Sequence, residues 1–242
     1  MQARQILIAL AIKHQGDWMK IYKDIQDRNS EGLEEIDTNI DAITMVDKDY
    51  PEELKKIHQP PFVLFYKGNK ELLKRKIVAV CGSRETTEGQ IARTKKIVNK
   101  LNENDYAVIN GLTAGIGHTA LETAKTKIAV LGFGIDACYP NSEKKLKKEI
   151  EKSGLVISEY PQEVYPATEN FMARQRIVAG LCNKMAIISV EKQSATLAGV
   201  SLALCNAKDI YCVPDLDNDE SECNKLINEG AFMLITGNEL LG

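Results

Sequence analysis

The three residues that follow the apolar run IVAVC, namely Gly82, Ser83 and Arg84, could together hold a phosphate group. Backbone amides in a glycine turn point toward anions, a serine hydroxyl adds a hydrogen bond, and a guanidinium can grip a phosphate through two N–H groups. A plainer alternative is a tight turn at Gly82 with a surface ion pair for Arg84. The tripeptide alone does not decide between these interpretations.

A second small-residue stretch, NGLTAGIG, follows another apolar run and contributes Asn110, Gly111 and Gly115. Its glycines follow the pattern G-x-x-x-G-x-G, whereas a dinucleotide-binding loop requires G-x-G-x-x-G. The sequence also lacks the G-x-x-x-x-G-K-[ST] motif of P-loop proteins. These patterns argue against an ordinary NAD enzyme and against a P-loop ATPase.

Two arginines and two hydroxyl residues occur later in similar settings. Arg174 and Arg176, in NFMARQRIVAG, are expected at the start of a helix, where the dipole disfavours cations unless an anion is bound. Two exposed arginines on a helix face would explain them equally well. In SVEKQSATLAG, Ser194 and Thr196 could contact a phosphate, although Ser194 could simply cap a helix.

Catalytic and metal-binding chemistry finds little support in the sequence. His118 is expected to cap or pack in the helix that it opens. Glu159 and Glu191 could form a carboxylate pair across the strand ends, or each could accept hydrogen bonds from nearby amides or arginines. The six cysteines include no CxxC pair, which favours reduced, mostly buried thiols in a cytoplasmic protein. We therefore expect no catalytic residue, no metal ion and no cofactor.

Alternating apolar runs and amphipathic patterns must position these residues. They predict an α/β fold, a Rossmann-like and mostly parallel sheet with helices on both faces. In such sheets ligands bind beyond the carboxyl ends of the strands. The predicted strands cover residues 76–82, 106–110, 127–132, 155–160, 184–190, 209–214 and 231–235. The predicted helices cover residues 90–101, 118–125, 142–152, 173–181, 195–205 and 223–230.

The first part of the chain has a different pattern. Residues 3–14 and 18–28 place apolar side chains three and four positions apart, as amphipathic helices do, and a short helix is expected to begin at Pro51. The run FVLFYKG then predicts a strand. We expect a small N-terminal helical accessory region at residues 1–66 and a Rossmann-like domain at residues 67–242.

The charges are unevenly distributed. Residues 71–214 hold 20 Lys and Arg against 15 Asp and Glu, whereas residues 215–242 hold 1 against 7. A mildly basic centre permits a polyanionic ligand, and a solvated surface explains the same counts. No apolar run has the length needed to span a bilayer, so we expect no membrane association.

Taken in order, the motifs at the predicted strand ends resemble those of DNA-processing protein A, the DprA/Smf family. The matching motifs are VAVCGSR, INGLTAGIGHTALETA, AVLGFGIDACYP, SEYP, NFMARQRIVAGL and SVEKQSATLAG. The resemblance covers about residues 48–235. It implies a cytoplasmic homodimer that binds single-stranded DNA and passes it to the RecA recombinase during recombination and natural transformation. It also implies that the protein has no established catalytic role.

The resemblance further implies where DNA would lie. Arg84 would hold a backbone phosphate, with Arg174 and Arg176 further along the same groove. Base stacking would fall to nearby aromatic side chains, with core packing the favoured alternative for Phe133. The stacking candidates are Phe133, Tyr139 and Phe171. The residues expected to bind DNA or its phosphates are Gly82, Ser83, Arg84, Asn110, Gly111, Gly115, Phe171, Arg174, Arg176, Ser194 and Thr196.

Some family positions differ in this chain. Ala114 and Gly117 stand where the family usually has an arginine and an aspartate, and Gln175 stands where it usually has an asparagine. Loss of one arginine removes a phosphate contact, which should soften the salt dependence of DNA binding. The acidic stretch at residues 215–242 could lie at a dimer or RecA interface, or be a solvated end.

Two other functions stay open. The first is a nucleotide-binding or nucleotide-hydrolysing protein similar to the nucleoside monophosphate phosphoribohydrolases, with Glu159 and Glu191 in a compact pocket. The P-G-G-x-G-T-x-x-E signature typical of such enzymes is absent from the sequence. The second is a protein-interaction module on a fold that has lost its ligand. A continuous basic groove would favour DNA, and a closed pocket with paired carboxylates would favour a nucleotide.

Overall fold

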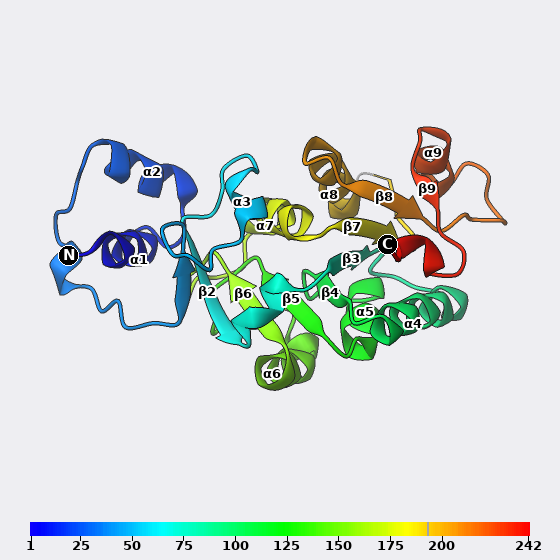
Figure 1. The fold of residues 1–242 in the computed structure, drawn as a ribbon, viewed down its shortest axis with the longest axis horizontal. Helices are drawn as coiled ribbons and strands as arrows, with labels where there is room; N and C mark the ends of the chain where they lie inside the picture. Colours follow the sequence, from blue (N-terminus) through cyan, green and yellow to red (C-terminus); the bar gives the residue numbers. More distant parts are fainter. Residues whose placement is uncertain (193) are drawn as a thin grey trace.

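A mixed sheet of nine strands runs through the structure in the order β1-β2-β6-β5-β4-β3-β7-β8-β9 (Figure 1). The coordinates are a computed structural model that describes residues 1–192 and 194–242. β1 and β2 pair antiparallel with their neighbours, and the other pairs are parallel. The strands are β1 (Ala42–Thr44), β2 (Val63–Gly68), β3 (Ile77–Cys81), β4 (Ala107–Asn110), β5 (Lys127–Leu131), β6 (Leu155–Ser158), β7 (Lys184–Ile187), β8 (Asp209–Cys212) and β9 (Phe232–Met233).

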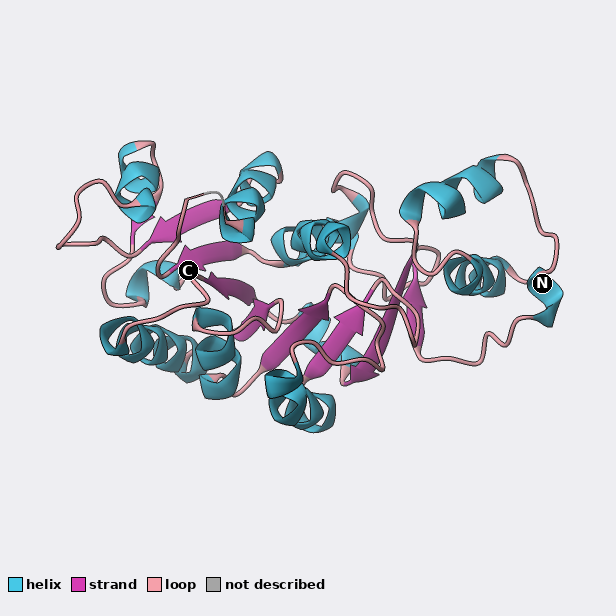
Figure 2. Cartoon of the chain, turned by 180° about the vertical axis from the view of Figure 1, so that it is seen from behind, coloured by secondary structure: helices cyan, strands magenta, loops and turns pink. Residues whose placement is uncertain are grey.

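Helices cover both faces of the sheet, as the alternating pattern predicted. α4, α5 and α6 lie on one face and α3, α7 and α8 on the other, while α1 and α2 lie beyond the β1 edge (Figures 1 and 2). The helices are α1 (Ala3–Lys13), α2 (Trp18–Gln26), α3 (Glu52–Lys55), α4 (Glu88–Glu103), α5 (Ile116–Thr123), α6 (Lys144–Ser153), α7 (Thr168–Leu181), α8 (Ala195–Cys205) and α9 (Glu222–Asn228). Short 3-10 turns occur at Leu33–Glu35, Lys70–Lys74, Asn141–Glu143 and Asn238–Leu240.

The central strands are apolar except at one end of each, at Asn110, Lys127 and Ser158, because both of their faces are covered. Every residue of β4, β5 and β6 is buried, including Lys127, whose ammonium reaches Glu149 at 2.8 Å. Continuous apolar runs of this kind are typical of parallel sheets between helical layers. The predicted fold class, a Rossmann-like and mostly parallel α/β sheet, is confirmed.

The N-terminal region contributes two strands as well as helices. β1 was not predicted from the sequence, because a three-residue strand is too short to show an alternating pattern. The boundary expected between residues 66 and 67 falls inside β2, which pairs with β6. The sheet therefore continues across that position, and the division into domains stays a prediction.

The order of the strands reverses beside β3. From β3 the chain moves outward through β4, β5 and β6, and then returns to place β7 against the other side of β3. The connections after β3 and β7 run to opposite faces of the sheet, through α4 and α8 respectively. Ligands of open α/β sheets bind at such a reversal, beyond the carboxyl ends of the strands.

Within the described part of the chain, we find no helix that combines the length and apolar character needed to cross a bilayer.

Candidate functional site

A cavity of about 420 Å³ opens at this reversal point, between the ends of β3 and β4, the N-terminal half of α7 and the segment that leads into α8. Nine of the eleven residues that the sequence singled out line it. The other two, Gly115 and Arg176, lie outside the cavity lining. The described lining residues are Cys81, Gly82, Ser83, Arg84, Glu85, Asn110, Gly111, Thr113, Phe171, Arg174, Gln175, Glu191, Lys192, Ser194, Ala195 and Thr196.

The turn at residues 82–84 forms one wall of the cavity, and residues 115–116 contact its other side. The Ser83 carbonyl oxygen accepts a hydrogen bond of 3.1 Å from the Ile116 amide. Gly115 has φ +71°, and a Cβ there would lie 2.3 Å from the carbonyl oxygen of Arg84. Gly115 therefore supports the turn without lining the cavity, because only glycine tolerates both that conformation and that close approach. The side chain of Arg84 is exposed.

Asn110 and Gly111 form the floor at the end of β4. Asn110 is 3 % exposed, and its Nδ2 donates to the Val80 carbonyl oxygen at 2.6 Å, which ties β4 to β3. Its Oδ1 accepts a hydrogen bond of 3.1 Å from the Thr113 hydroxyl. A Cβ on Gly111 would lie 2.3 Å from Cζ of Arg174. Gly111 thus makes room for the guanidinium.

Arg174 brings a buried positive charge to the cavity. Its side chain donates from Nη1 to the Gly111 carbonyl oxygen at 2.7 Å, and its Cζ lies 5.5 Å from the centre of the Phe171 ring. In the part of the chain that the structure describes, Nε has no hydrogen-bond partner and Arg174 forms no ion pair. Burial lowers the pKa of Arg174 to about 10, so the group is still charged at neutral pH. A buried cation with an unused donor is suited to an anionic ligand.

Aromatic rings lead from Arg174 toward the surface. Phe171 lines the cavity, and Tyr139, 52 % exposed, lies 5.9 Å from it between ring centres. Phe133 meets the edge of Phe171 at 6.3 Å but is 1 % exposed, so it packs in the core, the alternative already favoured for it. Phe171 and Tyr139 are the two rings placed where a flat group could stack.

Arg176 has a different environment from Arg174. Its Nη2 donates to Oε1 of Glu159 at 2.5 Å, and its Nε and Nη1 donate to the carbonyl oxygens of Gln59 and Ala173. Both arginines lie in the middle of α7, which begins at Thr168, so the expectation that they open the helix was wrong. The sequence pattern started the helix at residue 173 because TENFM carries no clear apolar period. Arg176 therefore links α7 to the residue that follows β6 and to the segment before β2 through buried hydrogen bonds.

Ser194 and Thr196 lie at the start of α8, on the wall facing Gly82. Ser194 occupies the N-cap position but makes no capping hydrogen bond, and its buried hydroxyl has no partner among the described residues. The Thr196 hydroxyl lies 3.5 Å from the Gly82 carbonyl oxygen. The plain capping role considered for Ser194 is therefore not observed, and Ser194 lines the cavity instead.

The paired-carboxylate pocket considered as an alternative is not formed. Glu159 is 5 % exposed, is bound to Arg176 and does not line the cavity, whereas Glu191 is exposed and does. Burial raises the pKa of Glu159, and the Arg176 guanidinium opposes that rise. The cavity instead mixes three cations, Arg84, Arg174 and Lys192, with two carboxylates, Glu85 and Glu191.

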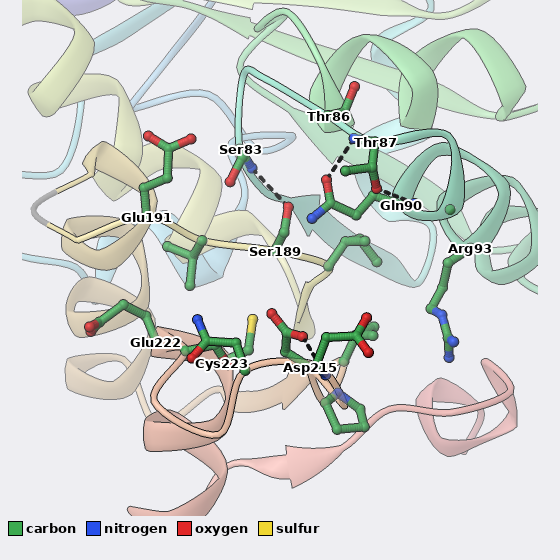
Figure 3. Close-up of a pocket in the computed structure, with 18 of the residues that line it drawn as sticks. Ser83, Thr86, Thr87, Gln90, Arg93, Ser189, Glu191, Asp215, Glu222 and Cys223 are labelled. Atoms are coloured by element: carbon green, nitrogen blue, oxygen red, sulfur yellow. Dashed lines mark hydrogen bonds between the residues drawn. The ribbon is translucent and has the colours of Figure 1, made fainter.

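A larger cavity of about 940 Å³ lies next to the first and shares Ser83, Glu85, Glu191 and Lys192 with it (Figure 3). The segment between β8 and α9 forms its outer wall and makes it acidic. The carboxylates that line it are Glu85, Glu191, Asp215, Asp217, Glu220 and Glu222, against the cations Arg93 and Lys192. The sequence counts revealed the excess of acid after residue 214 but not that it folds back beside the basic cavity.

His118 lies away from both cavities, at the start of α5. Its Nδ1 is 2.7 Å from Oε2 of Glu143, which is 3 % exposed. It packs at the head of its helix, as expected. In residues 1–192 and 194–242 we find no cluster of three or more His, Cys, Asp or Glu side chains arranged to hold a metal ion.

A family model and the most similar curated proteins point to the same family. The family model described as DNA recombination-mediator protein A matches residues 41–242. The chain is 35 % identical over 206 residues to DNA processing protein DprA of Streptococcus pneumoniae, covering 83 % of this chain and 73 % of that protein. It is 33 % identical to protein Smf of Synechocystis sp., covering 84 % of this chain and 54 % of that protein.

Solved structures agree with the sequence comparison. The X-ray structure of DNA processing protein A from Streptococcus pneumoniae superposes with a TM-score of 0.81 at 30 % identity, over 99 % of this chain and 92 % of that one. DNA processing protein A from Helicobacter pylori, whose single-stranded DNA binding mode is described as unique, gives a TM-score of 0.77 at 25 % identity, over 85 % of this chain and 96 % of that one.

Proposed function

Because the chain belongs to the DNA recombination-mediator protein A family, we propose that it acts by binding single-stranded DNA in the cavity at the ends of β3 and β4. The observation that carries the proposal is Arg174, a buried cation with a free Nε and no carboxylate partner among the described residues. A backbone phosphate would supply the missing partner. The Helicobacter pylori relative, which has a described single-stranded DNA binding mode, supports the same ligand class.

The residues around Arg174 suit one backbone phosphate and one base. Arg84 is exposed at the mouth, where it can approach the phosphate from outside while Arg174 holds it from within. Ser83, Ser194 and Thr196 add hydroxyl groups to the same wall. Phe171 offers a ring for stacking, a contact worth about 1–3 kcal/mol per base and tolerant of sequence. The proposed role is therefore binding without base specificity and without catalysis.

The acidic cavity limits the path that single-stranded DNA can take across the surface. Its six carboxylates against two cations would repel a polyanion, so DNA that leaves the phosphate position passes over Phe171 and Tyr139 instead. The path over Phe171 and Tyr139 has no continuous row of cationic side chains in the described part of the chain. We accordingly expect affinity to rest on few phosphate contacts and on stacking.

The proposal includes two protein partners. One is a second copy of the chain: β9 is the edge strand of the sheet, and Phe232, Met233 and Ile235 on or beside it are 53 %, 52 % and 41 % exposed. An open apolar edge of this kind readily pairs with another chain. The other partner is the RecA recombinase, to which the bound strand would be delivered in the cytoplasm during recombination and natural transformation.

Fluorescence anisotropy of a labelled oligo-dT, measured across a salt titration, tests the DNA-binding proposal. Arg84→Ala should weaken binding about tenfold and reduce the slope of log affinity against log salt by about 0.7, the value for one lost phosphate contact on a single strand. Arg93→Ala, which removes an arginine from the acidic cavity, is the matched control and should leave both quantities unchanged.

Three outcomes would contradict the proposal. Absence of oligo-dT binding at low salt excludes a single-strand binder. Equal losses for Arg84→Ala and Arg93→Ala would point to non-specific attraction. Displacement of oligo-dT by an equal concentration of a single mononucleotide would favour the nucleotide-binding alternative, for which a cavity of 420 Å³ is large enough.

RecA delivery is then tested by RecA ATP hydrolysis on DNA already covered by a single-strand binding protein, with and without this protein.

A further inference from the structure

The outward face of α6 carries a row of exposed lysines. At about 100° per residue their side chains fall within an arc of about 100°, whereas Leu146 and Ile150 point to the opposite side, into the core. The row is about 12 Å long, because each residue adds 1.5 Å along the helix axis. The side chains of this α6 lysine row are Lys144, Lys145, Lys148 and Lys152.

The carboxylates of the same helix do not neutralise the α6 lysine row. Glu149 is paired with buried Lys127 at 2.8 Å, and Glu151 is paired with buried Lys147 at 2.5 Å. Among residues 1–192 and 194–242, no ion pair includes a lysine of the row. Like charges three and four residues apart repel, and the dipole disfavours the cations in the first turn. An anionic partner would relieve both of these unfavourable terms.

The α6 lysine row begins next to the aromatic side chains of the cavity. Tyr139, whose ring lies 5.9 Å from that of Phe171 between centres, is followed by the turn Asn141–Glu143 and then by α6. The first turns of α6 are tied to the segment before Tyr139, since Nζ of Lys147 donates to the Ile135 carbonyl oxygen at 2.9 Å. A strand that passes over the two rings therefore reaches the start of the row.

The charges on the two sides of the cavity favour this direction. The acidic segment at residues 215–222 follows β8, on one side of β3, whereas α6 packs on β5 and β6 on the other side (Figure 1). Two carboxylates between β5 and α6 do not reverse the contrast, because Asp136 is paired with Lys67 and Glu143 is buried beside His118. A polyanion in the cavity is thus repelled from one side and attracted to the other.

We propose that the α6 lysine row is a second phosphate-binding surface, which holds single-stranded DNA after it has passed Phe171 and Tyr139. The inference rests on the proposed binding at the cavity and extends it. A strand that ends at Tyr139 makes few phosphate contacts, whereas a longer strand adds those of α6. Lysines bind phosphates as point charges and do not read the bases, which suits a binder that tolerates any sequence.

Anisotropy titrations with two lengths of labelled oligo-dT separate the two surfaces. An oligomer of about 6 nucleotides is expected to occupy only the cavity and the two rings, and one of about 20 nucleotides to reach α6 as well. In Lys145→Gln/Lys148→Gln, affinity for the long oligomer should fall about tenfold. The slope of log affinity against log salt should decrease by about 1.4, or about 0.7 for each lost contact. The short oligomer should bind unchanged.

A matched control lies on α4, which is nearer the acidic cavity. Lys95→Gln/Lys96→Gln removes two exposed lysines that also form no ion pair in the described part of the chain, and it should alter neither affinity. Acylation of lysines in the unsubstituted protein gives an independent measurement. The long oligomer should protect the α6 lysine row from the reagent, the short oligomer should not, and Lys95 and Lys96 should react equally in all samples.

Other results would overturn the proposal. Equal losses for the α6 and α4 variants would show general charge attraction, and weaker binding of the short oligomer to the α6 variant would place its effect at the cavity. Unchanged binding of both lengths to the α6 variant rejects the row and leaves the proposed function standing. Absence of short-oligomer binding to the unsubstituted protein rejects the cavity and this extension together. Equal protection of the row by a duplex of the same length contradicts a single-strand path.

Discussion

Arg174 donates a hydrogen bond of 2.7 Å to the carbonyl oxygen of Gly111, a residue 63 positions earlier in the chain. The contact joins the middle of α7 to the end of β4, and Nε of the same guanidinium has no partner among residues 1–192 and 194–242. One buried cation is thus fixed in place by a neutral acceptor. Its charge stays available to a ligand, whereas an ion pair would have neutralised it.

Replacement of this arginine should separate binding from stability. Arg174→Met keeps an unbranched apolar chain against Phe171 and removes a buried charge that has no carboxylate partner in the described part of the chain. Burying such a charge costs free energy, so the urea midpoint should stay the same or rise. Affinity for oligo-dT should fall about tenfold or more, because a charge-assisted phosphate contact is lost. Parallel losses of stability and binding would show that Arg174 is structural. Arg93→Met is the control for loss of a positive charge elsewhere.

A methyl group at Gly111 should displace the same guanidinium. In Gly111→Ala the new Cβ would come 2.3 Å from Cζ of Arg174, so the side chain must move. Oligo-dT affinity should therefore fall by about the same factor as in Arg174→Met. Gly199→Ala is the matched control, since its nearest neighbour is the Gln175 side chain at 3.7 Å. Anisotropy titrations of both variants check this, and equal affinities would mean that the position of Arg174 is unimportant for DNA.

The second arginine of α7 should behave in the opposite way. Glu159→Ala leaves the buried Arg176 without its partner and should lower the free energy of unfolding by about 3–5 kcal/mol. Oligo-dT affinity of the folded protein should not change, because neither residue lines the cavity. Glu52→Ala, which breaks an exposed pair with Lys55, should cost less than about 1 kcal/mol. Urea unfolding checks the ranking, and a DNA-binding defect in folded Glu159→Ala would contradict the separation.

A charge on the edge strand should prevent self-association. Met233→Lys places an ammonium on β9, where a pairing chain would bury it. If the proposed dimer forms through this edge, light scattering after size exclusion should show a dimer for the unmodified chain and a monomer for Met233→Lys. Leu204→Lys, a similarly exposed position on α8, should leave the dimer intact. A dimer that survives Met233→Lys would move the interface away from this edge.

The sequence by itself determined the fold class and the edge of the sheet at which the candidate site residues gather. Apolar runs separated by amphipathic helices specify a parallel sheet because strands buried on both faces must be apolar throughout. Parallel strands direct their carboxyl ends to one edge, so Gly82, Asn110 and Ser194 were expected to meet there, and they do. The short β1 strand carried too few residues for a period and was missed.

Only the tertiary structure decided what each charged residue does. Arg174 and Arg176 look alike in sequence, yet side chains two positions apart on a helix point in directions about 160° apart. One therefore faces the cavity and the other faces Glu159, and which is which depends on how α7 sits on the sheet. The acidic segment at residues 215–222 is equally non-local, since it borders the cavity only because β8 lies beside β7. The sequence pattern shows which residues share a face of a helix or strand. It does not show which charged side chains lie close together, because those distances depend on how segments distant in the sequence pack.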